Sequence, residues 1–80
     1  MTSSEIDITK FLAKEVWFHN QKLYVKLSDN REVGVPIEWF PRLAKATKKQ
    51  LDNWRLIGQG MGIHWEDVDE DISVIKLFLP

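Results

Sequence analysis

The sequence predicts an α+β domain: a three-stranded antiparallel meander with short helices packed on one face and a short C-terminal helix. Two observations predict this class. Residues 16–35 show the two-residue alternation of half-buried strands, interrupted by turn-forming residues. Residues 37–51 repeat their large apolar side chains at helical spacing. Four tryptophans, four phenylalanines and one tyrosine help a chain of 80 residues to bury a core of its own.

The domain boundaries follow from the polarity of the N-terminus. Residues 1–10 are polar and without clear period, so we expect a frayed N-terminus, with residues 11–80 as a single α+β domain. The first strand covers residues 16–18 and stops at His19-Asn20, a pair that favours turns.

The remaining strands of the meander follow from the alternation in residues 23–27. Apolar Leu, Val and Leu alternate there with Tyr and Lys, which is typical of a half-buried strand. Asp29-Asn30 tolerates positive φ and predicts a two-residue hairpin turn, with the return strand over residues 31–35.

The helices follow the strands. Pro36 ends the third strand, because proline has no N–H to give to a ladder. Residues 37–46 predict a short helix with Pro41 in its first turn. Its apolar residues share one side at helical spacing: Trp39, Phe40, Leu43 and Ala46. Thr47 and Gln50 form a capping box that starts a second short helix, which carries Leu51 and Trp54 inward.

The last third of the chain allows more than one arrangement. Residues 55–58 and 62–65 are extended runs that either pair with each other or extend the edge of the meander. The glycines between them predict a turn with positive φ. Residues 73–79 predict a short terminal helix with Ser73 as N-cap, and a last strand is the alternative.

Composition excludes several classes of protein. The chain has no cysteine, so it forms neither disulfides nor a thiolate metal site. Its N-terminus lacks the features of a signal peptide, and no apolar run approaches the roughly 20 residues of a membrane helix. We therefore expect a soluble, cytoplasmic protein. A net charge of −1 argues against direct nucleic-acid binding.

The charges are nevertheless segregated along the chain. Residues 42–55 carry five basic side chains against one acid, and residues 66–71 carry five acids and no base. We expect the two groups to approach one another, and binding of charged partners is the alternative.

Three segments resemble a known family. The resemblance is carried by the alternation in residues 23–31, by Trp39-Phe40-Pro41-Arg42-Leu43, and by Gly62-Ile63-His64-Trp65 followed by Asp69-Glu70-Asp71-Ile72-Ser73. The chain resembles the bacterial family known as domain of unknown function 2442. The resemblance implies a small α+β domain, sometimes fused to helix-turn-helix domains. Family members are often encoded beside another small protein, in pairs that look like toxin–antitoxin cassettes. The resemblance supplies no catalytic residues.

The acidic segment and the histidine before it are the clearest candidate site. The simplest role of Asp69 and Asp71 is to cap the terminal helix, while partner binding or a hard cation are alternatives. His64 is either a hydrogen-bonded structural residue or a ligand-facing, pH-sensitive one. His64 and Glu66 also open the zinc-deaminase pattern, but the cysteines of that pattern are missing. No hydroxyl has a base beside it, so we assign no catalytic residue, metal or cofactor.

The expected function is protein–protein interaction, as indicated by charge segregation and abundant aromatic residues. An antitoxin-like or regulatory member of a two-gene pair is one form of this function, and a second copy of the chain is another partner. The alternative is small-ligand binding in a cleft near Trp39, Arg42, His64 and Trp65. A metal-dependent hydrolase using His64 and nearby acids is a weaker reading. The expected binding residues are Trp39, Arg42, His64, Trp65, Glu66, Asp69 and Asp71.

Overall fold

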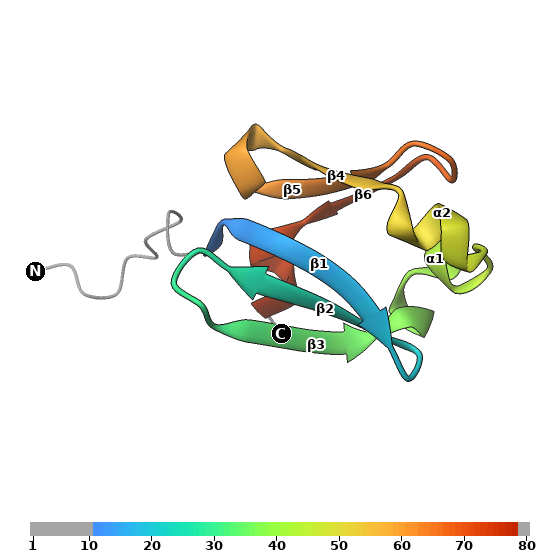
Figure 1. Cartoon of the computed structure of the whole chain (residues 1–80), viewed down its shortest axis with the longest axis horizontal. Coiled ribbons are helices and arrows are strands. Elements are labelled where there is room, and N and C mark those ends of the chain that lie inside the picture. Colours follow the sequence, from blue (N-terminus) through green and yellow to red (C-terminus); the bar gives the residue numbers. More distant parts are fainter. Residues whose placement is uncertain (1–10, 79–80) are drawn as a thin grey trace, which may run out of the picture.

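The computed structural model describes residues 11–78 and has a mixed α and β fold that is mostly β. Two three-stranded antiparallel sheets form separate layers, with two short helices beside them at one end (Figure 1). The expected frayed segment, residues 1–10, lies outside the described residues. None of the helices within residues 11–78 has the length and apolar character needed to cross a lipid bilayer.

The first sheet consists of β1 (Ala13–His19), β2 (Lys22–Leu27) and β3 (Glu32–Pro36), in that order. Alternate residues of β2 point into the protein and are fully buried: Leu23, Val25 and Leu27. A bulge between Ala13 and Glu15 lets β1 turn both Ala13 and Val16 inward, although they are three residues apart. The strands expected between residues 16 and 35 are therefore present.

The turn between β2 and β3 differs from the expected two-residue turn. Leu27 N donates to Arg31 O at 2.7 Å, and Asn30 N donates to Leu27 O at 2.9 Å, so the loop has three residues. Asn30 takes the left-handed conformation, with φ of 73°, that closes such a loop. Asp29 instead accepts from Arg31 N at 3.1 Å, so its role is hydrogen bonding rather than positive φ.

The second sheet consists of β4 (Trp54–Ile57), β5 (Gly62–Trp65) and β6 (Glu70–Ser73). The two extended runs pair with each other and do not extend the first sheet, which decides between the two expected arrangements. The connection η3 (Gly58–Gly60) contains the expected positive φ, and it lies against β1. A Cβ on Gly60, whose φ is +103°, would lie 2.6 Å from Ala13 O, so no larger residue fits there.

The helical residues between 37 and 52 occupy one end of the molecule, where we expected them to cover one face of a single sheet (Figure 1). The expected helix of residues 37–46 is broken at Phe40, with η2 (Ile37–Trp39) before it and α1 (Pro41–Ala44) after it. The second helix is α2 (Lys48–Asp52), and Thr47 and Gln50 form the expected capping box. The terminal segment η4 (Val74–Phe78) is a 3-10 helix that begins directly after β6.

The core lies between the two sheets, so the second sheet takes the place that we expected helices to fill. From the second sheet, Ile63, Trp65 and Ile72 point inward, and Leu43 of α1 closes one end. The indole Nε1 of Trp65 donates to Leu51 O at 3.0 Å. This bond satisfies the one polar atom of the Trp65 side chain, which has no exposed surface.

Candidate functional site

The outer face of the second sheet carries a row of ionisable side chains, one from each strand. Arg55 of β4 is opposite His64 of β5, and His64 is opposite Asp71 of β6. In a strand, successive side chains point to opposite faces, so His64 points outward between the inward Ile63 and Trp65. The row is therefore built by strand pairing across segments that are far apart in the sequence.

His64 makes contacts with two carboxylates. Its Nδ1 is hydrogen-bonded to Asp71 Oδ1, and its Nε2 lies 3.0 Å from Glu66 Oε1. Arg55 Nη2 lies 3.4 Å from the same Glu66 oxygen. Only 14% of the histidine side chain is exposed, so both contacts are sheltered on one side by the sheet.

This arrangement raises the pKa of His64 above its ordinary value of 6.5. The hydrogen bond to Asp71 is the largest cause; partial burial opposes it, and the hydrogen bond to Glu66 adds to the rise. A neutral imidazole donates from only one nitrogen, whereas an imidazolium donates from both. The two carboxylates therefore stabilise the charged ring.

The turn between β5 and β6 is fastened to the helical end of the protein. Arg42 Nη1 of α1 donates to Asp69 O at 2.5 Å and lies 3.9 Å from Asp69 Oδ2. Asn53 Nδ2 donates to Asp67 Oδ2 at 3.1 Å. Basic and acidic segments thus meet within one molecule, in part through main-chain rather than ionic contacts. Asp69, with φ of 53°, forms the turn, and Asp71 lies in β6, so neither has the expected helix-capping role.

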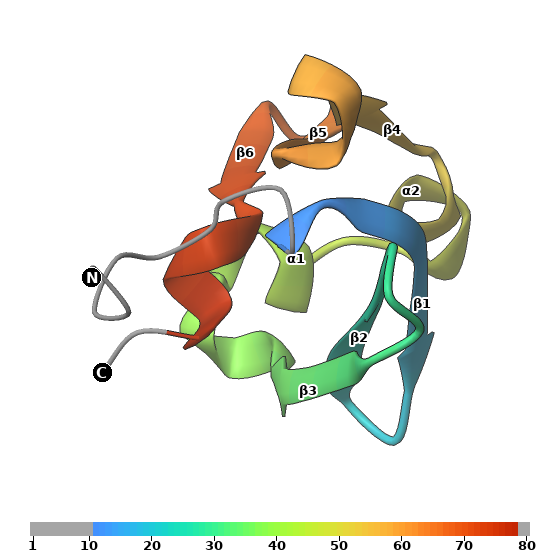
Figure 2. The same ribbon diagram turned by 90° about the vertical axis from the view of Figure 1, so that its left-hand side faces the viewer.

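A groove runs along the free side of β6, and we name it the β6 groove. Figure 2 shows β6 on the outer side of the second sheet, next to η4. The cavity volume is about 460 Å³, and its lining combines a strand edge with aromatic and aliphatic side chains: Trp39, Phe40, Asp71, Ile72, Ser73, Lys76 and Leu77. Trp39 is 61% exposed, an unusual state for the largest apolar side chain.

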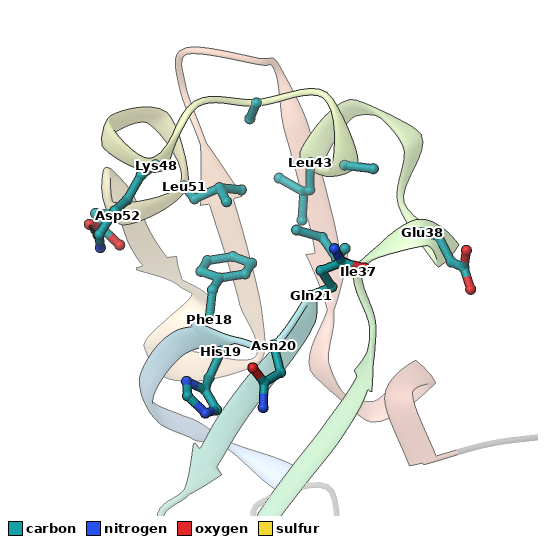
Figure 3. A pocket seen from close by; sticks show the side chains of 12 residues that line it. Phe18, His19, Asn20, Gln21, Ile37, Glu38, Leu43, Lys48, Leu51 and Asp52 are labelled. Atoms are coloured by element: carbon teal, nitrogen blue, oxygen red, sulfur yellow. Dashed lines mark hydrogen bonds and ion pairs between the residues drawn. The ribbon is translucent and has the colours of Figure 1, made fainter.

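A second cavity of about 550 Å³ lies between the β1–β2 turn and the short helices, and we name it the hairpin cavity. Figure 3 shows Phe18, Leu43 and Leu51 pointing toward its centre. Its rim is polar and comprises His19, Asn20, Gln21, Glu38, Lys48 and Asp52. Gln21 O accepts from Ile37 N at 3.0 Å, which joins the β1–β2 turn to the start of η2.

The structure brings most of the expected binding residues to the second sheet and its turn. His64, Glu66 and Asp71 form one hydrogen-bonded group, and Arg42 and Asp69 form another at the turn. Trp39 and Asp71 both line the β6 groove, so Trp39 belongs to the same region of the surface.

Trp65 has a different place from the one expected. It has no exposed surface, and its ring packs edge-on against Phe18 at 6.2 Å between centroids. A ligand at the surface would not reach it in this conformation. The burial of Trp65 could have been predicted from strand alternation in residues 62–65, because alternation puts His64 and Trp65 on opposite faces of the sheet.

Sequence reasoning missed Arg55, Ser73 and Lys76 as members of the site, because they join it only through strand pairing and the course of η4. Within the part of the chain that the structure describes, no group of three or more His, Cys, Asp or Glu side chains could hold a metal ion.

Two solved structures are similar to this chain. The crystal structure of a protein of unknown function from Rhodospirillum rubrum ATCC 11170 is 28% identical, with 84% of this chain and 83% of that chain covered and a TM-score of 0.73. The solution structure of an uncharacterized protein from Chromobacterium violaceum is 23% identical, with 84% and 63% covered and a TM-score of 0.72, which supports the fold alone. No protein of curated function matches significantly. A family model described as "Protein of unknown function (DUF2442)" matches residues 13–80, and the chain therefore belongs to this family.

Proposed function

We propose that the chain is a protein–protein interaction module and that the β6 groove is its contact surface. The observation that carries this proposal is the exposure of Trp39, 61%, beside an open strand edge. Tryptophan and arginine are the residue types enriched among the side chains that dominate binding energies. Arg42 follows Trp39 by three residues and is 60% exposed.

The groove also offers polar groups that would orient a partner. Asp71 and Lys76 add opposite charges to its lining, and Phe40 and Leu77 add apolar surface. Such a mixture of an apolar centre and a polar rim is typical of interaction surfaces. An antitoxin-like or regulatory role in a two-gene pair is one form of this function, and it is supported by the family resemblance rather than by the groove itself.

The test compares the full chain with two variants in cells of its source organism. Tagged wild type, Trp39→Ala and Met61→Ala are used for affinity capture, and any stoichiometric partner is then purified and titrated against each. Met61 is the matched control, because it is apolar and 47% exposed but does not line the groove.

We expect Trp39→Ala to weaken binding by about tenfold or more, because a buried aromatic anchor contributes upwards of about 1.4 kcal/mol. Met61→Ala should bind as the wild type does. Equal binding by all three proteins, or the absence of any stoichiometric partner, would contradict the proposal.

Small-ligand binding is a second candidate, and the hairpin cavity is the observation that favours it. Its volume of about 550 Å³ is within the range of small-molecule sites, and its apolar floor with a polar rim is typical of them. This location differs from the cleft expected near Trp39 and Trp65.

A thermal-shift screen of small aromatic and aliphatic compounds tests this candidate. Ala46→Phe should abolish any stabilisation, because Ala46 lines the cavity and a phenyl ring there would fill it. Ser28→Phe is the control, since Ser28 is exposed and lies outside the cavity. Shifts that persist in Ala46→Phe would place the ligand elsewhere and contradict the candidate.

A further inference from the structure

We propose that the hairpin cavity binds an uncharged aromatic compound, whose polar group is hydrogen-bonded by the side chain of Gln21. The proposal rests on small-ligand binding, the second candidate function above, and names the class of ligand. Three features of the cavity support it: the side chains that point to its centre, the position of the charged side chains at its margin, and the hydrogen bonds that hold its walls.

The centre of the hairpin cavity is apolar. Figure 3 shows Phe18, Leu43 and Leu51 pointing toward it from three different elements. Leu43 has no exposed surface, and Phe18 and Leu51 are half-buried. Ala44 and Ala46 also line the cavity, and their short side chains fill little of it. An aromatic ring at the centre would bury apolar surface there, and its contact with the Phe18 ring would add an aromatic pair.

The charged side chains of the lining lie at the margin of the cavity. Lys48 Nζ and Asp52 Oδ2 are 3.0 Å apart, and the two side chains are 89% and 57% exposed, so this ion pair is largely in water. Glu38 lies at the opposite margin, and Figure 3 shows its carboxylate directed away from Phe18 and Leu43. A charged ligand at the centre would therefore lose water without gaining an ionic partner, which is costly. The cavity thus favours an uncharged ligand.

One polar side chain, that of Gln21, points inward. Figure 3 shows it directed toward Ile37 and Leu43, whereas His19 and Asn20 beside it point away from them. A glutamine amide has both a donor and an acceptor, so it can bond either a hydroxyl or a carbonyl group. Gln21 is therefore placed to bond the polar group of an uncharged ligand whose ring occupies the apolar centre.

Hydrogen bonds hold the walls of the cavity. Asn20 and Gln21 have φ of 51° and 62°, the left-handed pair that forms a two-residue hairpin turn, and Gln21 O accepts from Ile37 N at 3.0 Å. On the side of α2, Leu51 O accepts from Trp65 Nε1 at 3.0 Å. Walls that are bonded in this way lose little conformational freedom when a ligand binds, which favours affinity.

The first experiment compares three probes of similar shape and different charge. Benzyl alcohol, benzylamine as its ammonium ion, and benzoate are titrated into the full chain at neutral pH, and NMR of the leucine methyl groups measures their dissociation constants. Benzyl alcohol should shift the methyl signals of Leu43 and Leu51 and bind about tenfold or more tightly than either ion, because the ions lose water without gaining a partner. Ala46→Phe should remove these shifts, because its ring would fill the cavity.

The second experiment tests Gln21 and does not depend on filling the cavity. Gln21→Glu puts a carboxylate of nearly the same shape in place of the inward amide. It should change the ratio of the two dissociation constants by about tenfold or more in favour of the ammonium ion over benzyl alcohol, because the ammonium ion then gains an ionic partner. Gln59→Glu is the matched control and should keep the wild-type ratio. Gln59 is also left-handed, with φ of 60°, and is exposed outside the cavity.

Equal binding of the three probes by the wild type would overturn the uncharged class and leave a small-ligand cavity standing. A ratio that Gln21→Glu and Gln59→Glu both leave unchanged would overturn the role of Gln21, and shifts that persist in Ala46→Phe would overturn the location. No shift at Leu43 or Leu51 with any probe at millimolar concentration would overturn the proposal. If the thermal-shift screen of the wider set also finds no ligand, small-ligand binding fails with it.

Discussion

His64 and Asp71 lie directly opposite each other on β5 and β6, and their side chains are hydrogen-bonded on the outer face of the second sheet. They form a pair without main-chain hydrogen bonds between them, the type in which side chains come closest. Asp71 also lines the β6 groove, so the charge of the histidine ring acts on a residue of the proposed contact surface.

The pH dependence of stability follows from this pair. Because folding raises the pKa of His64, the charged ring stabilises the folded state at pH values below the ordinary value of 6.5. That stabilisation is lost as the pH rises through the folded-state pKa. Urea denaturation gives the free energy of unfolding of the wild type and of His64→Gln at each pH. From pH 5.5 to about 8.5, the value for the wild type should fall relative to that for His64→Gln. A constant difference between the two proteins across this range would contradict the prediction.

Removing either carboxylate should lower the pKa of His64, and by different amounts. Asp71→Asn should lower it more than Glu66→Gln, because the Asp71 hydrogen bond is the largest cause of the rise and the Glu66 hydrogen bond is a smaller one. NMR titration of the ring protons measures both, and His19, at the end of β1 in the first sheet, is the internal control. An equal or larger effect of Glu66→Gln would show that the main contact has been assigned to the wrong carboxylate.

Trp65→Phe should destabilise the fold by about 2–3 kcal/mol, because it leaves a void and takes away the hydrogen bond to Leu51 O. Trp39→Phe is the matched control and should change the free energy of unfolding by less than about 0.5 kcal/mol, since Trp39 is exposed. Chemical denaturation followed by circular dichroism measures both. Similar losses of unfolding free energy in the two variants would contradict the prediction that the buried tryptophan contributes more to stability than the exposed one.

Gly60→Ala should cost more stability than Gly58→Ala. Both glycines have positive φ, which costs an alanine about 1–2 kcal/mol in the left-handed region. At Gly60 the added Cβ also meets Ala13 O at 2.6 Å, whereas at Gly58 its nearest neighbour is 3.5 Å away. The difference in the free energy of unfolding between the variants therefore measures the contact between η3 and β1. Equal costs would indicate that β1 moves aside freely.

The first sheet could be predicted because its pattern is local. Leu23, Val25 and Leu27 alternate without interruption, and turn-forming residues lie at both ends of β2. The second sheet was harder to predict, because each of its strands has only four residues. In β6 a single apolar residue, Ile72, points inward, so no period can be detected.

The candidate site could be predicted by its residues but not by its geometry. The density of charge and aromatic residues indicated His64, Asp71 and Trp39, which do lie in one region. Arg55 joins His64 only through pairing of β4 with β5. Helical spacing predicted Trp39 inward, but the break at Phe40 puts it in a separate turn with a different direction.

The bulge at Lys14 has a consequence for the alignment of relatives. Because Lys14 is the extra residue of β1, a chain without it would keep Ala13 opposite Leu27 and Glu15 opposite Lys26. Such a chain would be one residue shorter, yet all its later side chains would face the same way. A single gap at this point in a relative is therefore compatible with an identical interior.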